Sequence, residues 1–149
     1  MDELKLSLKI TLANTFLMYF KTQSYHWNVE GMFFPLFHDF FGELYQEVYG
    51  AVDPLAEEIR ALDDYAPMSL DELHSTATVK EDVVRPVLIR DMLENLQQAN
   101  QEVLDSLNKV FDLATAEKEQ GLADFAGSRI DAHKKHAWMI RSSLKKIEE

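Results

Sequence analysis

An all-α fold, a four-helix bundle with one short extra helix, is predicted by three features of this sequence. Glycine (5 residues) and proline (4 residues) are scarce in the 149-residue chain, whereas turn-rich β folds use both freely. Four long segments carry apolar residues at steps of three and four, which places them on one face of a helix. Hydrophobic residues make up 46% of the chain, enough for one core, so we expect a single domain over residues 1–149.

The first two helices are expected to form an antiparallel hairpin. The first runs from about Leu4 to Asn28, and a turn follows at Val29–Gly31. The second begins near Pro35, a residue favoured in the first turn of a helix, and ends near Asp63–Asp64. The core face of this second helix is expected to hold Phe37, Phe41, Leu44, Val48, Leu55, Ile59 and Leu62.

A long connection over residues 65–86 separates the two halves of the chain. Within it, Ser69–Glu72 looks like the capped start of one or two helical turns. The third helix is expected over about Val87 to Ala114 and the fourth over about Gly121 to Ile147. Two antiparallel hairpins joined by a long crossover make the ferritin-like form of the four-helix bundle.

Composition excludes several classes of function. The formal charge of −11 argues against passive binding to nucleic acid, which depends on Lys and Arg. The absence of cysteine excludes disulfides and thiolate metal sites. No apolar run approaches the roughly 20 residues that span a bilayer, and the N-terminus does not resemble a signal peptide. We therefore expect a cytoplasmic protein with no membrane association.

The second helix carries a second apolar face, through Phe34, His38, Tyr45, Tyr49 and Val52. A bundle helix needs only one buried stripe, and aromatic residues are enriched in subunit interfaces. This face therefore predicts a homo-oligomer. The alternative is an exposed aromatic patch on a monomer, although large patches of that kind are uncommon.

Four candidate metal ligands lie beside this second face. Asp53 and Glu57 are four residues apart, so both carboxylates project from one side of the helix. His38 precedes Asp53 by fifteen residues, which in a helix is roughly 22 Å. His38 therefore cannot share a metal with Asp53 of its own chain. His26, near the end of the first helix, falls at the same end of the hairpin as His38.

The two imidazoles and the two carboxylates thus form separate half-sites. A twofold axis crossing the second helix near Tyr45 or Gln46 would bring the imidazoles of one chain to the carboxylates of the next. Two such sites would form in each dimer. Mixed histidine and carboxylate ligands suit iron, with zinc, manganese or cobalt as competitors.

Several motifs together resemble the Dps family of mini-ferritins (DNA-binding proteins from starved cells). They are Tyr25-His26-Trp27-Asn28-Val29-Glu30-Gly31, His38, Asp53-x-x-x-Glu57 with Arg60, Gly121-x-Ala123-Asp124-Phe125 and the run from His133 to Met139. The resemblance covers nearly the whole chain. It implies a hollow shell of twelve subunits with a ferroxidase centre at each end of every dimer interface.

The resemblance also implies roles for particular residues. His26 and His38 would come from one subunit, and Asp53 and Glu57 from its twofold mate. Ferrous iron would be oxidised there, preferentially by hydrogen peroxide, and ferric mineral stored in the cavity. Trp27 matches an aromatic residue beside the centre that would intercept stray oxidising equivalents. The alternative function is a shell-forming or nucleoid-associated protein whose metal site has weakened.

The chain departs from the family pattern at two positions. Gly42 stands where family members often carry another carboxylate, four residues after the second histidine. The second iron position is therefore expected to be weak or absent, or to be supplied by Asp39 or Glu43 instead. Pro54 removes a backbone donor inside the predicted helix. The alternative interpretation is that Asp53 caps a new helix starting at Pro54, with Glu57 an ordinary first-turn acid.

The remaining polar residues receive simpler interpretations. His133 lies on the apolar stripe of the fourth helix and is predicted to be a core residue, whereas His136 and His74 are predicted to be exposed. Asp124 stands where the family forms an acidic threefold pore, with Glu117 and Glu119 as further candidates for iron entry or as a solvated helix end. No Lys-rich tail of the kind that binds DNA in the family is visible, so DNA binding is expected to be weak or absent at physiological salt.

A larger ferritin with its di-iron site inside each bundle is a third hypothesis. Such a site needs inward glutamates and Glu-x-x-His motifs on several helices. The chain contains no Glu-x-x-His, which disfavours this hypothesis.

Overall fold

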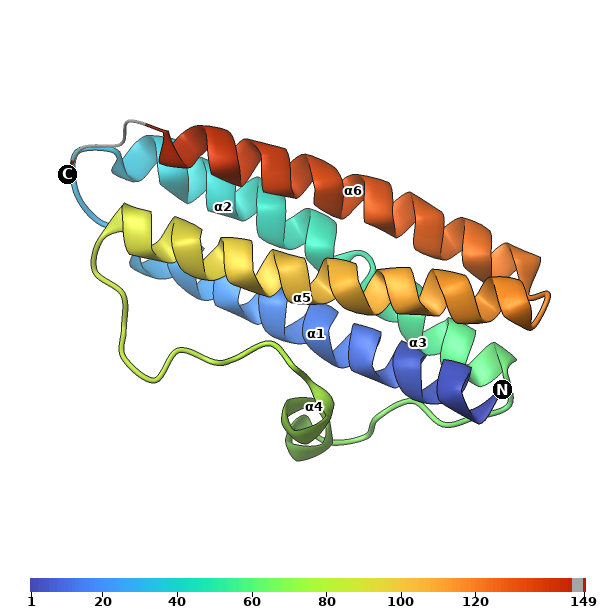
Figure 1. Ribbon diagram of the computed structural model, residues 1–149. Helices are drawn as coiled ribbons and strands as arrows, with labels where there is room; N and C mark the ends of the chain where they lie inside the picture. Colours follow the sequence, from blue (N-terminus) through green and yellow to red (C-terminus); the bar gives the residue numbers. More distant parts are fainter. Residues whose placement is uncertain (146–148) are drawn as a thin grey trace.

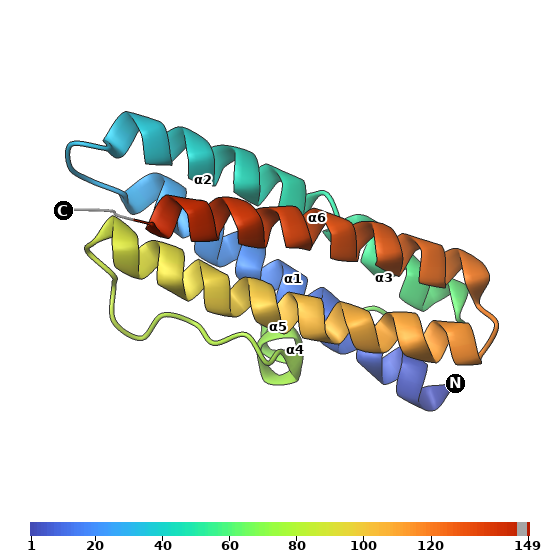
Figure 2. The ribbon, with the colours of Figure 1, turned by 45° about the horizontal axis from the view of Figure 1, so that its top comes forward.

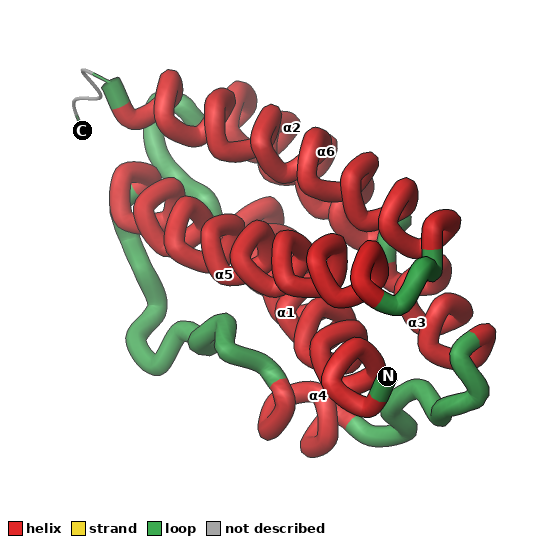
Figure 3. Tube along the Cα trace, turned by 45° about the vertical axis from the view of Figure 1, so that its right-hand side comes forward, coloured by secondary structure: helices red, strands yellow, loops and turns green. Residues whose placement is uncertain are grey.

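The computed structural model describes residues 1–145 and residue 149. The described residues form helices and loops without any strand (Figure 3). The helices are α1 (Asp2–Asn28), α2 (Phe34–Tyr49), α3 (Val52–Ala61), α4 (Leu70–Thr76), α5 (Ile89–Ala116) and α6 (Gln120–Leu144). The predicted all-α bundle with a short extra helix is therefore confirmed. The predicted end of the fourth helix, Ile147, lies outside the described residues.

The bundle consists of two antiparallel hairpins. Helix α1 pairs with α2 and α5 pairs with α6, while α1 and α5 lie side by side (Figures 1 and 2). Helix α3 continues roughly along the line of α2, and both pack on α1. Residues 62–88 form the crossover, which carries α4 across the outside of α1. In the described part of the chain, no helix is both long and apolar enough to cross a membrane.

The second bundle helix is interrupted, contrary to the prediction of one continuous helix from Pro35 to Asp63–Asp64. The N–H of Ala51 donates to the carbonyl of Val48 at 3.1 Å, a tighter turn than that of an α-helix. Pro54 has no N–H to donate to the carbonyl four residues before it. Helix α3 then begins at Val52 with Ala51 as its N-cap. The alternative in which Asp53 caps a helix that starts at Pro54 is therefore also wrong.

Helix α1 is buried on most of its surface because it packs against α2, α3, α4 and α5. This explains why the buried residues of α1 lie on more than one side of the helix and include polar side chains. Two of its buried hydroxyls are satisfied locally: Thr11 and Thr22 donate to the carbonyls of Ser7 and Met18 at 2.8 and 2.7 Å. A buried hydroxyl with such a partner avoids most of its desolvation penalty.

The crossover is tied to α1 by side-chain hydrogen bonds. Asn14 Oδ1 accepts from the backbone N–H groups of Thr78 and Val79 at 2.7 and 3.0 Å. Tyr25 donates its hydroxyl to Asp82 at 2.7 Å, and Lys21 forms an ion pair with the same carboxylate at 3.0 Å. The short helix α4 begins as predicted, since Ser69 accepts from the N–H of Glu72. These contacts hold the long connection in one conformation.

Candidate metal centre

Two imidazoles meet at the end of the bundle where α1 turns into α2. The rings of His26 and His38 stack with centroids 3.8 Å apart and planes inclined by 16°. The ring of Phe34 stacks on His38 at 4.9 Å. Both histidines are half-buried. Gly31, with a positive φ of 107°, helps to close the turn that brings them together.

Reciprocal hydrogen bonds fix the orientation of both rings. His26 Nδ1 lies 2.6 Å from the carbonyl oxygen of His38, and His38 Nδ1 lies 2.7 Å from the carbonyl oxygen of His26. A carbonyl only accepts, so each Nδ1 must carry the hydrogen. The Nε2 of each neutral ring then keeps its lone pair. Histidines that bind metals through Nε2 are commonly oriented in this way by a carbonyl at the other nitrogen.

Gly42 makes room for one of these rings. A Cβ at this position would lie 3.1 Å from both Cε1 and Nδ1 of His26, closer than an ordinary van der Waals contact. The position one turn after His38 is therefore filled by the imidazole of His26. This packing gives a physical reason for glycine at this position.

Aromatic rings continue from the histidines along α1 and α2. His26 and Tyr45 have centroids 5.3 Å apart, Tyr45 and Tyr19 are 6.1 Å apart, and Tyr19 and Tyr49 are 4.6 Å apart. Burial, followed by the neighbouring tyrosines, raises the pKa of Tyr19. Trp27, which follows His26 in α1, is 57% exposed, and Tyr49 of α2 is 53% exposed. The second apolar face of α2 is thus partly open in the single chain.

Asp53 and Glu57 lie on α3, away from the histidines. Both are exposed, and neither forms a hydrogen bond or ion pair through its carboxylate with another described residue. Helix α3 lies at the opposite end of the bundle from the α1–α2 turn (Figure 1). Among the described residues, no three His, Asp or Glu side chains converge closely enough to hold a metal ion. One chain therefore brings the two histidines together but not the quartet.

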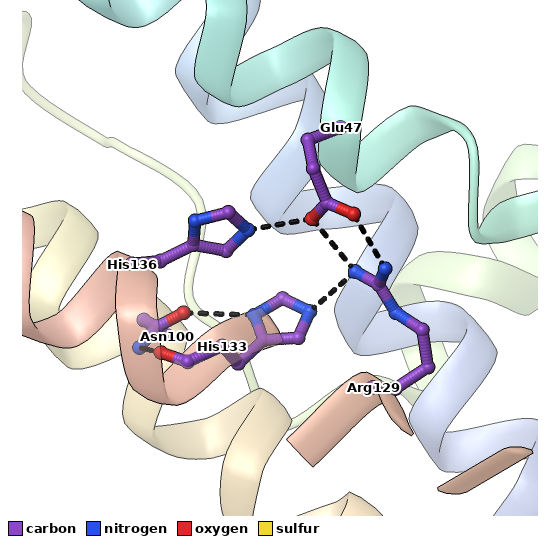
Figure 4. A network of polar contacts seen from close by, with 5 residues as sticks. All are labelled: Glu47, Asn100, Arg129, His133 and His136. Carbon is purple, nitrogen blue, oxygen red and sulfur yellow. Dashed lines mark hydrogen bonds and ion pairs between the residues drawn. The ribbon is translucent and has the colours of Figure 1, made fainter. Parts of the chain in front are cut away.

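His133 and His136 belong to a second polar cluster between α2, α5 and α6 (Figure 4). His133 is fully buried, as predicted. The prediction that His136 is exposed is wrong: it is 5% exposed because Glu47 of α2 covers it, with Nε2 and Oε1 2.6 Å apart. Sequence reasoning also missed Glu47 and Arg129, which form a bidentate ion pair. The available signal was that Arg129, His133 and His136 share one helix face.

Burial and charge shift the pKa values of this cluster. Burial, followed by the Arg129 and His136 charges, lowers the pKa of His133 to about 3, so its ring is neutral. Hydrogen bonds from His136 and from Arg129 hold the pKa of the Glu47 carboxyl well below its usual range despite its partial burial. The cluster therefore contains one carboxylate and one guanidinium around a neutral imidazole.

The acidic residues of the α5–α6 turn lie where the sequence placed them. Asp124 is exposed near the start of α6, and Glu117 pairs with the N-terminal amine of Met1 at 2.6 Å. Burial, followed by the charge of Glu119, raises the pKa of Glu58. The role of Asp124, Glu117 and Glu119 in iron entry stays a prediction.

Comparisons with known proteins place these features in context. Residues 6–149 match the model of the ferritin-like domain family. The chain is 32% identical over 134 residues to an uncharacterized low temperature-induced protein of Nostoc, covering 89% of this chain and 75% of that protein. It is 33% identical over 135 residues to a DNA protection during starvation protein of Halobacterium salinarum, covering 85% and 72%.

The fold has a close counterpart among solved structures. The crystal structure of a Dps protein from Vibrio cholerae O1, described as a member of a broad superfamily of ferritin-like diiron-carboxylate proteins, superposes with a TM-score of 0.92 at 27% identity. The match covers 97% of this chain and 90% of that one.

Proposed function

Since this chain belongs to the Dps family of ferritin-like proteins, we propose that it is a ferroxidase and iron-storage mini-ferritin. It oxidises ferrous iron with hydrogen peroxide at inter-subunit sites and stores the ferric mineral inside a shell, in the cytoplasm. The supporting observation is the His26–His38 pair, whose Nδ1 atoms are each fixed by a carbonyl while both Nε2 atoms keep a lone pair for a cation.

The proposed centre is completed by a second subunit. His26 and His38 of one chain bind iron together with Asp53 and Glu57 of the twofold-related chain. The carboxylates are exposed and have no partner among the residues that the structure describes, and they supply the negative charge that neutral imidazoles lack. Mixed nitrogen and oxygen ligands of this kind also bind zinc, manganese and cobalt, so these ions are expected to compete with iron.

Iron is the substrate of this reaction rather than a resident cofactor. Each of two ferrous ions loses one electron, and one peroxide molecule accepts both electrons and two protons to give two waters. Two-electron use of peroxide releases no hydroxyl radical, so the reaction protects the cell from oxidative damage. We propose that Trp27, which is exposed and follows His26 in α1, donates an electron if a one-electron oxidant escapes.

Assembly into a homo-oligomer, which we propose is a dodecamer of twofold dimers, accounts for the open aromatic face. Phe34 and Tyr49 are 39% and 53% exposed, and Phe20 of the neighbouring α1 is 52% exposed. Exposed aromatic residues that lie together on one face are typical of a subunit interface.

Ferrous titration followed by peroxide addition tests the proposed function. The protein should bind ferrous iron at about two sites per dimer, as the twofold arrangement requires, and should produce the ultraviolet absorption of ferric product at once on adding peroxide. No ferric signal and no metal at the quartet would overturn the ferroxidase assignment. That result would favour the alternative, a shell-forming or nucleoid-associated protein with a weakened metal site. The observation that supports this alternative is Gly42, which stands in place of a carboxylate.

Gly42→Ala should slow iron oxidation several-fold without preventing folding. The added methyl group would push the His26 ring by a few tenths of an ångström, and small displacements of a ligand from its productive geometry lower rates. The measurement is the initial rate of ferric product formation together with the melting temperature.

Gly127→Ala is the matched control for that substitution. Its Cβ would meet only Phe111, at an ordinary 3.9 Å, so this variant should gain about 1 kcal/mol of helix stability and keep the normal rate. An unchanged rate in Gly42→Ala would show that the close contact at Gly42 does not set the position of His26.

DNA binding is expected to be weak or absent at physiological salt. The chain carries 26 Asp and Glu against 15 Lys and Arg, and affinity for DNA depends mainly on cations that neutralise phosphates. A gel-shift assay at low and at physiological salt checks this expectation. Retardation of DNA at physiological salt would contradict it.

A further inference from the structure

A positive charge lies among metal-type ligands between α2 and α6 (Figure 4). The guanidinium of Arg129 donates to both carboxylate oxygens of Glu47, at 2.6 and 3.0 Å. The same guanidinium lies 3.1 Å from His133 Nε2. His136 Nε2 lies 2.6 Å from the Glu47 oxygen that also receives the longer Arg129 bond. The Glu47 carboxylate and the His133 imidazole therefore contact the Arg129 guanidinium directly, and the His136 imidazole contacts the same carboxylate.

The buried imidazole at this position is oriented in the way that metal ligands are. Asn100 Nδ2 donates to the backbone carbonyl of His133 at 2.9 Å, so its Oδ1 is turned towards His133 Nδ1 and accepts from it at 2.8 Å. The hydrogen is therefore on Nδ1, and the Nε2 lone pair points at the guanidinium. A partner that fixes the far nitrogen is what prepares a histidine to bind a metal through the near one.

The Arg129 guanidinium is held between Glu47 and His133 although not all of its N–H groups are hydrogen-bonded. The side chain of Arg129 is only 11% exposed, yet its Nε has no hydrogen-bond partner, and neither does His136 Nδ1 among the buried atoms of the described residues. Buried donors are normally paired. Arg129 lies between the Glu47 carboxylate and the His133 lone pair although its own Nε stays unpaired. This position indicates that the site requires a positive charge.

We propose that Arg129 takes the place of a metal ion inside the bundle and that Glu47, His133 and His136 form a divalent-metal site that its guanidinium closes. Donors from facing helices that point into the interior are how ferritin-like bundles hold metals. With Arg129 in place, the three groups do not converge on one point, and its charge repels a second cation. This inference rests on the proposed function and refines it, since it restricts iron to the inter-subunit sites.

Cobalt binding tests this inference directly. The parent for the experiment is His26→Ala with His38→Ala, which removes the proposed inter-subunit centre. Adding Arg129→Ala should create one new cobalt site per chain with visible absorption bands of a four- or five-coordinate ion, whereas the parent should show none. Further addition of Glu47→Gln should remove those bands. Absence of cobalt bands in the folded Arg129→Ala variant would overturn the proposal.

Two further measurements complete this test. The first distinguishes the effect of the Arg129 charge from the effect of its volume, and the second applies if the Arg129→Ala variant does not fold. Arg129→Lys keeps the positive charge and should bind no cobalt, so cobalt bands equal to those of Arg129→Ala would contradict the charge argument. If Arg129→Ala is unfolded without metal, zinc should restore its helical circular dichroism and raise its melting temperature. No rescue by zinc would count against the site.

The outcome is independent of the test of the proposed function. Cobalt absorption is read in a background that lacks the inter-subunit histidines, so failure here leaves the ferroxidase assignment standing. Failure of iron oxidation in the unmodified protein, in turn, leaves the cobalt result unchanged.

Discussion

Replacing His26 and His38 together with alanine is expected to lower the rate of ferrous oxidation by more than about 100-fold. Loss of even an outer partner of a metal ligand costs about 10- to 100-fold in metal affinity or activity, and this change removes both nitrogen ligands of the proposed centre. The measurement is the rate of ferric product formation after peroxide addition, with ferrous binding measured in parallel.

The assembly should survive this double substitution. Both rings are half-buried at the end of the bundle, and the buried core residues of the same two helices, such as Tyr25 and Phe41, are unchanged. Light scattering should therefore give the wild-type mass. His74→Ala is a suitable control, because its side chain is 63% exposed and lies on α4, away from the proposed centre. Normal oxidation by the double variant would show that iron reacts elsewhere.

Much of the fold could be predicted because it depends on local patterns. The stripe of α5, from Ile89 to Val110, follows steps of three and four and is buried throughout. Ser69, with Glu72 three residues later, marks the start of α4, and the structure has the expected hydrogen bond. Such signals involve residues close together in the sequence, so a single sequence is enough to recognise them.

The break in the second bundle helix was harder to predict. Pro54 was a local signal of a break, but the apolar stripe continues in phase through Leu55 and Ile59. The pattern therefore favoured one helix. The interruption comes from a missing backbone donor at Pro54 and a locally tightened turn, and the period of the apolar residues records neither.

The contacts of the candidate site were also predictable only in part. The turn that joins α1 and α2 is short, so the spacing of His26 and His38 was enough to predict that they meet. The contacts of Glu47 with Arg129 and His136 join residues 82 and 89 positions apart. They depend on the register of α2 against α6, which no local pattern fixes. For this reason His136 was assigned to the surface.

Mixing two inactive variants should restore part of the activity if the centre is shared between subunits. One variant lacks the nitrogen ligands (His26→Ala with His38→Ala), and the other lacks the carboxylates (Asp53→Asn with Glu57→Gln). In a dimer that contains one chain of each kind, one of the two twofold-related sites receives all four wild-type ligands and the other receives none. Each variant alone has no complete site.

The size of the recovery follows from this geometry. Random reassociation makes about half of the dimers mixed, and half of their sites complete, so about one quarter of the wild-type sites should be active. A centre built within one chain would give no recovery, because every chain in the mixture lacks two ligands. The observable is the initial oxidation rate after dissociation and joint reassembly, compared with each variant reassembled alone. A recovery near one quarter is therefore expected only if His26 and His38 act with carboxylates of another chain.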